Sequence, residues 1–205
     1  ELCLTLEEWE ERFARWVRMP EPQALLNATI FFDFRPLFGR FNLAHRLRLA
    51  LFRQTRGSPL FLRMLAENAL SVAPPLGRIR DFVTSSDPEH PGTIDLKTYG
   101  VRLFTDAARV FALANSVEAT NTVQRLRRAG AVMNIGADDL AASIEGFNFL
   151  QLLRLRHQHF EQEHGRPGDN LIRPDDLNEI ERRVLKEAFR QARKLQARLR
   201  LDYQL

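Results

Sequence analysis

The clearest fold signal is the stretch NEIERRVLKEAFRQARKLQARLRLDY at residues 178–203. Apolar side chains recur in it every three or four residues, which is typical of one face of an α-helix. Asn178 is a typical residue to precede a helix, because its side chain can accept a hydrogen bond from the free backbone N–H groups of the first turn. The residues expected to face a core are Val184, Leu185, Ala188, Phe189, Ala192, Leu195 and Leu199. We therefore predict a long amphipathic helix here.

The same period predicts six more helices along the chain. They are expected over residues 5–18, 41–55, 58–71, 98–114, 120–129 and 137–163. The first opens on the capping box Thr5-Leu6-Glu7-Glu8, and Ser58-Pro59 supplies an N-cap followed by a proline at the first helical position. Gly130 and Gly165 are expected to end two of the later helices. We predict an all-α fold, an antiparallel helical bundle.

Residues 27–35, which read NATIFFDFR, are the most strand-like part of the chain. β-Branched and aromatic residues favour strands, and a strand here would place Asp33 and Arg35 on one face. A lone strand leaves its backbone groups unpaired. The segment is therefore expected either to belong to a sheet formed by residues upstream of Glu1, or to be helical or irregular.

Residues 72–95 interrupt the helical pattern with four prolines and two glycines. Leu76, Ile79 and Phe82 are expected to dock this non-helical segment on the helices. Loops of this length are typically either mobile or functional, because a plain connection between helices needs far fewer residues.

The composition is that of a globular protein. The 205 residues are 44% apolar and 27% charged, which excludes collagen-like, disulfide-rich and wholly disordered chains. No apolar run is long enough to span a membrane, and one cysteine cannot form an internal disulfide. With no signal peptide evident, we expect the cytoplasm. The chain lacks an initiator Met, so we expect it to be part of a larger protein.

The net charge of +4 comes from 30 basic and 26 acidic residues, and all but three of the basic residues are Arg. Arg forms bidentate contacts with phosphate and carboxylate groups. This pattern is compatible with a nucleic acid or a phosphorylated ligand, but ordinary surface ion pairs account for it more simply.

The densest polar cluster follows the long interruption and comprises Asp95, Lys97, Arg102 and Arg109. Arg102 and Arg109 are seven residues apart and so share a helix face, and Arg154 could reach the same groove from the helix over residues 137–163. Guanidinium and ammonium groups that converge on a groove bind phosphate or carboxylate. The alternative is a structural ion-pair network in which Asp95 pairs with Lys97 or Arg109.

His157, Glu161 and His164 share one face of the helix expected over residues 137–163. A di-iron site would need a second such motif and two further Glu residues from other helices. The sequence holds no second copy of the motif, so we predict no metal site and expect a solvated polar face.

Several motifs occur in an order that is specific as a set. They are IFFDFRPLFG at residues 30–39, IDLK at 94–97 with Gly100 and Arg109, Thr122 with Arg125, LRLRHQ at 153–158, and LKEA at 185–188. In this order they resemble the C-terminal half of bacterial uridylyltransferase-like nucleotidyltransferases, which often carry cyclic-nucleotide-binding and CBS modules upstream. The helical part is similar to the substrate-binding domain of those proteins.

The resemblance implies a catalytic domain of the DNA-polymerase-β type, with a Gly-Ser loop followed by an Asp-x-Asp pair that holds two metal ions. That combination does not occur in this sequence, so it is expected upstream of Glu1. Residues 1–40 are then the end of the catalytic domain and residues 41–205 the substrate-binding domain. Asp33 resembles the third carboxylate of such sites. The chain alone is expected to be inactive, whereas the full-length protein would use Mg²⁺ and a nucleoside triphosphate.

The resemblance further implies transfer of a nucleoside monophosphate to a protein or small-molecule acceptor, with the upstream catalytic domain as a partner. A homodimer is left open, and no membrane is expected. The competing hypothesis is a non-catalytic helical module whose Arg-rich last helix binds a protein. Nucleic acid is the least favoured partner, because the last helix lacks the interleaved aromatic residues that stack on bases. Its basic residues are Arg193, Lys194, Arg198 and Arg200.

Overall fold

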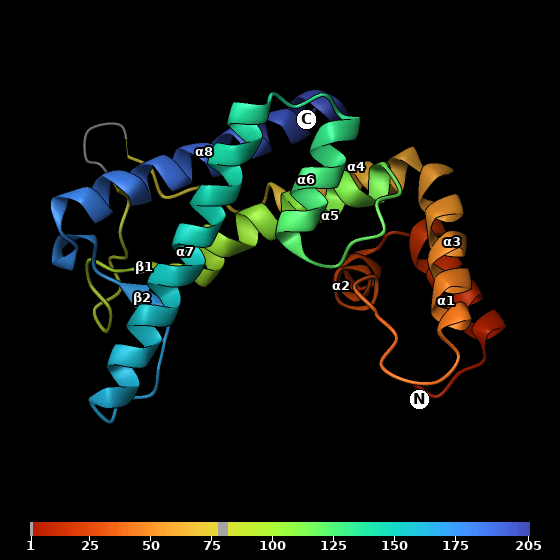
Figure 1. Cartoon of the computed structure of the whole chain (residues 1–205), viewed down its shortest axis with the longest axis horizontal. Coiled ribbons are helices and arrows are strands. Elements are labelled where there is room, and N and C mark those ends of the chain that lie inside the picture. Colours follow the sequence, from red (N-terminus) through yellow and green to blue (C-terminus); the bar gives the residue numbers. More distant parts are fainter. Residues whose placement is uncertain (1, 78–81) are drawn as a thin grey trace. The chain divides into compact units, whose positions relative to one another are not determined.

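The computed structural model describes residues 2–77 and 82–205 and confirms the all-α class (Figure 1). The α-helices are α1 (Leu6–Arg18), α2 (Pro22–Phe31), α3 (Phe41–Arg56), α4 (Pro59–Ala69), α5 (Arg102–Ala114), α6 (Thr122–Val132), α7 (Ala137–Glu163) and α8 (Glu179–Tyr203). The short elements are β1 (Ile94–Asp95), β2 (Leu171–Ile172), the π-helix η1 (Lys97–Val101) and the 3₁₀-helix η2 (Pro174–Asp176). Within the described residues, no helix combines the length and the apolar character that crossing a membrane requires.

The chain divides into two compact units, which we describe separately. Unit 1 comprises Glu1–Asn68 and Ala108–Met133, and unit 2 comprises Ala69–Ala107 and Asn134–Leu205. The division passes through α5. The assignment of residues 1–40 to the end of a catalytic domain stays a prediction.

Unit 1 is built around an aromatic core to which α1, the end of α2 and α4 contribute. The predicted capping box is present, because Thr5 Oγ1 accepts from the Glu8 backbone N at 3.2 Å and Glu8 Oε2 accepts from the Thr5 backbone N at 2.7 Å. Phe13, Phe32 and Phe61 are fully buried, and Phe13 meets Phe32 edge to face with 4.8 Å between ring centroids. Aromatic pairs in this arrangement stabilise a core beyond their buried area.

The strand considered for residues 27–35 does not form. Residues up to Phe31 belong to α2, which begins at Pro22, and Asp33 follows in a turn. The buried residues Ala24, Leu25 and Ala28 have helical spacing, and α2 packs on α1. A helix satisfies its backbone groups within the segment, whereas a strand without a partner could not. Packing therefore overrides the strand propensity of Ile30 and Phe31.

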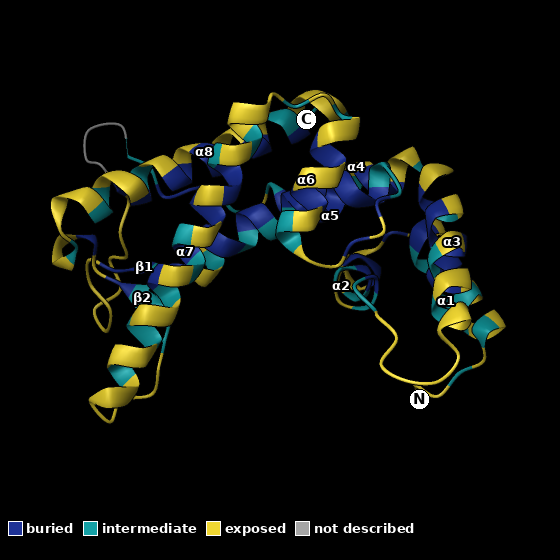
Figure 2. Ribbon diagram, viewed as in Figure 1, coloured by how far each residue is buried: buried dark blue, intermediate teal, exposed yellow. Residues whose placement is uncertain are grey.

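Unit 2 is organised by the packing of α7 against α8. Gly146 lies at their contact, where an added Cβ would come within 3.2 Å of Ala188 Cα, so a larger residue would push the helices apart. Both helices match their predicted ranges, and bands of buried residues alternate with exposed ones along α8 (Figure 2). Gly165 has the expected positive φ of 70° after α7.

The prediction for Gly130 is wrong, because this residue lies inside α6 and is buried. The helix continues to Val132, and Asn134 takes the left-handed conformation with φ 53°. Asn is the residue other than Gly that most readily adopts this conformation, since its side chain can bond to nearby backbone.

The non-helical segment after α4 packs on α8 within unit 2, as expected. Leu76 and Phe82 form an antiparallel bridge, and the buried Phe82 meets Phe189 edge to face. Ile79, the third docking residue, lies outside the described residues. Further on, β1 pairs with β2 in an antiparallel ribbon that sets Ile94 opposite Ile172.

Candidate functional site

The groove predicted around Asp95 and Lys97 has a different local structure. Asp95 Oδ1 accepts from the backbone N atoms of Lys97 and Thr98 at 2.8 and 3.1 Å, and Oδ2 accepts from Thr98 Oγ1 at 2.7 Å. The carboxylate thus caps the first turn of η1 and holds backbone. Lys97 is exposed.

The predicted arginines of unit 2 bind neighbours on their own helices. Arg102 Nε donates to Asp106 Oδ2 at 3.0 Å, and Arg154 Nη1 donates to Gln151 Oε1 at 3.0 Å. Neither arginine lines the two cavities of unit 2 described below. Of the predicted groove residues, Asp95 alone lines one of these cavities, the apolar one.

Arg109 belongs to unit 1, where it meets another predicted residue, Asp33. Arg109 Nη2 donates to Asp33 Oδ2 at 3.0 Å, and Arg125 Nη2 donates to Asp33 Oδ1. Arg48 donates through Nη1 and Nη2 to the carbonyl oxygens of Phe32 and Phe34, which flank Asp33. We call Asp33, Arg48, Arg109 and Arg125 the arginine cluster.

Electrostatics in the arginine cluster favour an ionised Asp33. Burial raises the pKa of Asp33, but the hydrogen bond from Arg125 and the charges of Arg109 and Arg125 outweigh it, so the pKa lies below its ordinary value. Burial, followed by the charge of Arg125, lowers the pKa of Arg48. With both of its oxygens accepting from guanidinium groups, Asp33 is committed to ion pairing in this structure.

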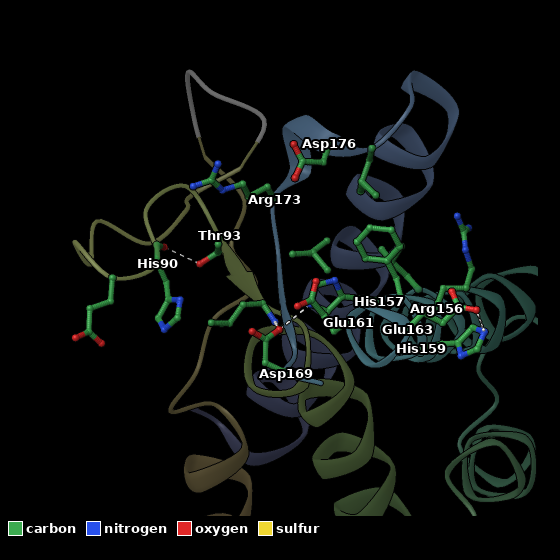
Figure 3. A pocket seen from close by; sticks show the side chains of 16 residues that line it. His90, Thr93, Arg156, His157, His159, Glu161, Glu163, Asp169, Arg173 and Asp176 are labelled. Carbon is green, nitrogen blue, oxygen red and sulfur yellow. Dashed lines mark hydrogen bonds and ion pairs between the residues drawn. The ribbon is translucent and has the colours of Figure 1, made fainter. Parts of the chain in front are cut away.

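A polar cavity of about 590 Å³ opens in unit 2 between α7, β2 and the segment that precedes β1 (Figure 3). His157 projects from α7, Asp169 from the turn before β2, and His90 from the segment on the opposite side. Arg173 and Asp176, which follow β2, also line it. Cavities of this size bind small molecules. We call it the polar cavity.

The polar cavity holds an imidazole paired with a carboxylate. His157 Nε2 lies 2.7 Å from Asp169 Oδ1, which also accepts from the Leu171 backbone N at 2.9 Å. Next to this pair, Gln158 Nε2 donates to Asn170 Oδ1 at 3.1 Å. These hydrogen bonds connect the last turns of α7 to the segment before β2 and fix the orientation of the His157 ring. An imidazole oriented by a carboxylate can take up a proton from a bound hydroxyl group.

Two further charges on the cavity wall are paired with residues outside it. Glu161 binds Arg166 Nη2 at 2.8 Å, and this hydrogen bonding holds the pKa of Glu161 below its usual range. Arg156 binds Glu181 at 2.7 Å. Among the described residues, no group of three or more His, Cys, Asp and Glu side chains could hold a metal ion.

A second cavity of unit 2, of about 540 Å³, is mainly apolar. Pro74, Pro75, Leu76, Val83 and Tyr99 line it, with Asp95 at its wall. It shares His90 and Thr93 with the polar cavity, so the segment before β1 forms a wall of both.

Sequence reasoning singled out His157 but not its partner. His157 and Glu161 were expected on a solvated face, and both line the polar cavity. Asp169 follows Pro167-Gly168, outside any helix, so no helical spacing of apolar residues indicates where its side chain points. A Cβ at Gly168 would lie 3.2 Å from the Gln158 carbonyl oxygen, so this glycine allows the close approach. The dipeptide Pro167-Gly168 directly before Asp169 was the sequence feature that could have indicated a close approach of this carboxylate to α7.

Comparison with known proteins identifies the family. A family model described as "Putative nucleotidyltransferase substrate binding domain" matches residues 59–203, well over half of the chain. Neither a curated protein nor a solved structure matches. The polar cavity and its histidine–carboxylate pair lie wholly within the matched residues. The chain therefore belongs to the nucleotidyltransferase substrate-binding domain family.

Proposed function

We propose that this chain binds the acceptor of a nucleotidyl transfer reaction in the polar cavity. The observation that carries the proposal is the His157–Asp169 pair, at 2.7 Å, on the wall of a cavity of small-molecule size. The family to which residues 59–203 belong supports the reaction class. The finer resemblance to uridylyltransferase-like enzymes, with a catalytic domain upstream in the same protein, is part of this proposal.

The cavity wall favours a neutral or cationic polar acceptor. Its acidic residues are Glu89, Glu161, Glu163, Asp169 and Asp176, and its basic residues are Arg156 and Arg173. With neutral histidines the wall therefore carries more negative than positive charge. An anionic acceptor would be repelled, whereas hydroxyl and amino groups find carboxylate and imidazole partners. We therefore infer a small polyhydroxylated or amino-bearing acceptor.

In this reaction the acceptor hydroxyl oxygen attacks the α-phosphorus of a nucleoside triphosphate, and pyrophosphate leaves. His157 takes the proton that the hydroxyl loses, while Asp169 holds the ring and stabilises the imidazolium. A proton shared between Nε2 and Asp169 leaves Nδ1 as the basic nitrogen. The two Mg²⁺ ions expected on the catalytic domain would neutralise the triphosphate charge.

The test measures transfer of labelled nucleotide to a panel of polyhydroxylated and aminated small molecules, with the chain joined to its catalytic domain and Mg²⁺ present. His157→Gln should lower kcat on the order of 100-fold with less change in the acceptor KM, because general-base catalysis contributes that much. His164→Gln is the matched control, since His164 ends the same helix and does not line the cavity.

Equal kcat values for wild type and His157→Gln, with folding unchanged, would exclude His157 as the base. Asp169→Asn should lower kcat while changing the acceptor KM little, because the amide still holds the ring but no longer stabilises its positive charge. The chain without a catalytic domain should transfer no nucleotide.

One observation favours a second function, binding of a protein partner. Leu37 and Phe38, between α2 and α3, are 81% and 96% exposed. Apolar side chains presented in this way are typical of protein contact sites. A protein that binds wild type but not the double variant Leu37→Ser/Phe38→Ser, with acceptor turnover unchanged, would assign this function to unit 1.

A further inference from the structure

We propose that the arginine cluster of unit 1 is a phosphate-binding site whose central position is held by the Asp33 carboxylate in this structure. The proposal concerns a different unit and ligand from the acceptor proposal and does not depend on it. The ligand chemistry is a phosphate group, supplied either by a nucleoside triphosphate or by a free phosphate or pyrophosphate ion.

The guanidinium groups of Arg109 and Arg125 converge on the Asp33 carboxylate. Arg109 and Arg125 each direct Nη2 to a different oxygen of Asp33, one at 3.0 Å and the other in closer contact. Two guanidinium groups that bracket the oxygens of one anion are the arrangement that recognises phosphate. Arg125 is itself oriented, because its Nε donates to the Ala119 carbonyl oxygen at 2.7 Å.

The cluster has an unused hydrogen-bond donor. Arg125 is 3% exposed, and its buried Nη1 has no hydrogen-bond partner in the part of the chain that the structure describes. A buried donor without a partner costs free energy, so native proteins rarely leave one in place without a reason. A phosphate group has more acceptor oxygens than a carboxylate and can satisfy this donor as well as those that Asp33 now serves.

The charge balance also favours an added anion. Arg48 stacks on the Phe34 ring at 4.2 Å and donates hydrogen bonds to two backbone carbonyl oxygens, and the cluster as defined contains one carboxylate, Asp33. Glu118 lies close enough to raise the pKa of Arg48 but faces the exposed His45 at 3.7 Å. The charge of Arg125 opposes the charge of Arg48, and the charges of Asp33 and Glu118 offset this repulsion. A doubly charged phosphate would add further negative charge beside Arg48 and Arg125.

The central position can be reached from solvent. The Asp33 side chain is 27% exposed, whereas the two guanidinium groups behind it are buried. Asp33 lies in the turn that ends α2, before a segment without regular structure that leads to α3. An incoming phosphate therefore meets Asp33 first and competes with it for the same donors.

The experiment exploits this competition. Binding of inorganic pyrophosphate, inorganic phosphate and a nucleoside triphosphate is measured by calorimetry on wild type and on Asp33→Asn. Removing the competing charge should tighten binding about tenfold, because a charge-assisted hydrogen bond contributes about that much to an equilibrium. Tighter binding of the triphosphate than of pyrophosphate assigns the nucleotide as the source, and equal binding assigns the free ion.

Two further variants test whether pyrophosphate binds at the arginine cluster. Arg48→Gln should weaken pyrophosphate binding, whereas Arg127→Gln, which removes an exposed charge from α6, should not. If Asp33→Asn is unstable, pyrophosphate should raise its melting temperature more than that of wild type. No binding to either protein, or equal affinity with and without the Asp33 charge, would overturn the proposal and leave the cluster as a purely structural network.

Discussion

The arginine cluster of unit 1 and the polar cavity of unit 2 both centre on one aspartate, but they are built differently. Asp33 is bound by guanidinium groups 76 and 92 residues further along the chain. Asp169 is bound by an imidazole only 12 residues away. The first site joins segments that are far apart in the sequence, and its two arginines are buried. The second joins two segments that are close in the sequence, on the wall of the polar cavity. In this structure the Asp33 charge is therefore held by buried ion pairs, whereas the His157–Asp169 pair lies on the wall of a cavity.

The largest expected effect tests the structural part of this contrast. Arg125→Met should lower the free energy of unfolding by about 3–5 kcal/mol, because it leaves Asp33 without its main partner in a buried site. Arg127→Met on the same helix is the control and should change stability by less than about 0.5 kcal/mol. Urea unfolding followed by circular dichroism measures both. Equal midpoints for the two variants would contradict the contrast.

A pair of double-mutant cycles sharpens the comparison. The coupling energy between Asp33 and Arg125 should exceed about 1.5 kcal/mol, because Arg125 is buried and the bond is charge-assisted. The coupling between His157 and Asp169 should stay below about 1 kcal/mol, since Asp169 is half-exposed. The cycles use Asp33→Asn with Arg125→Met, and His157→Gln with Asp169→Asn. Reversed magnitudes would mean that the polar cavity, not the cluster, is the structural element.

The pH dependence of stability should reveal the contribution of the Asp33 charge in the arginine cluster. The folded-state pKa of Asp33 is lowered by Arg125 and Arg109 against the effect of burial. Its contribution is therefore complete above the unfolded-state pKa of about 4 and is lost as pH falls through the folded-state value. Wild type should exceed Asp33→Asn in stability at pH 7, and the gap should close in acid. A gap that persists unchanged at pH 2 would show that the Asp33 charge is not its source.

The smallest effects are expected at the predicted groove, which belongs to neither site. Asp95→Ala should cost about 1 kcal/mol, because the carboxylate caps the first turn of η1. Lys97→Ala should change stability by less than about 0.5 kcal/mol, as exposed substitutions do. Thermal melting of the two variants distinguishes them. A large loss for Lys97→Ala would revive the ion-pair network considered from the sequence.

The helices were predictable because their signals are local. The apolar period of α8 and the capping box at Thr5 need only a few neighbouring residues, and both predictions are confirmed. For residues 27–35 the sequence left a strand and a helix or irregular segment open, and the structure shows the helix α2 up to Phe31 followed by a turn at Asp33. Propensity could not decide between a strand without a partner and α2 packed on α1.

The sites were predictable residue by residue but not as assemblies. Asp33 and Arg109 were both singled out from the sequence, yet nothing local says that residues so far apart form one ion pair. Arg125 was named only in the family resemblance. Its burial follows from packing between helices, which the spacing of apolar residues does not indicate. The structure places Lys97 and Arg102 outside both cavities of unit 2, and a sequence does not distinguish an exposed or self-paired side chain from one that lines a groove.

The discontinuity of unit 1 has a consequence for synthesis on the ribosome. Its first part ends at Asn68, but its remaining part runs from Ala108 to Met133. At about 5–20 residues per second, several seconds pass before Arg125 can reach Asp33. During that time Asp33 is in the nascent chain without the guanidinium groups of Arg109 and Arg125. The first part of unit 1 thus completes its ion pairs only after the intervening segment has been made, and a chaperone has time to bind there.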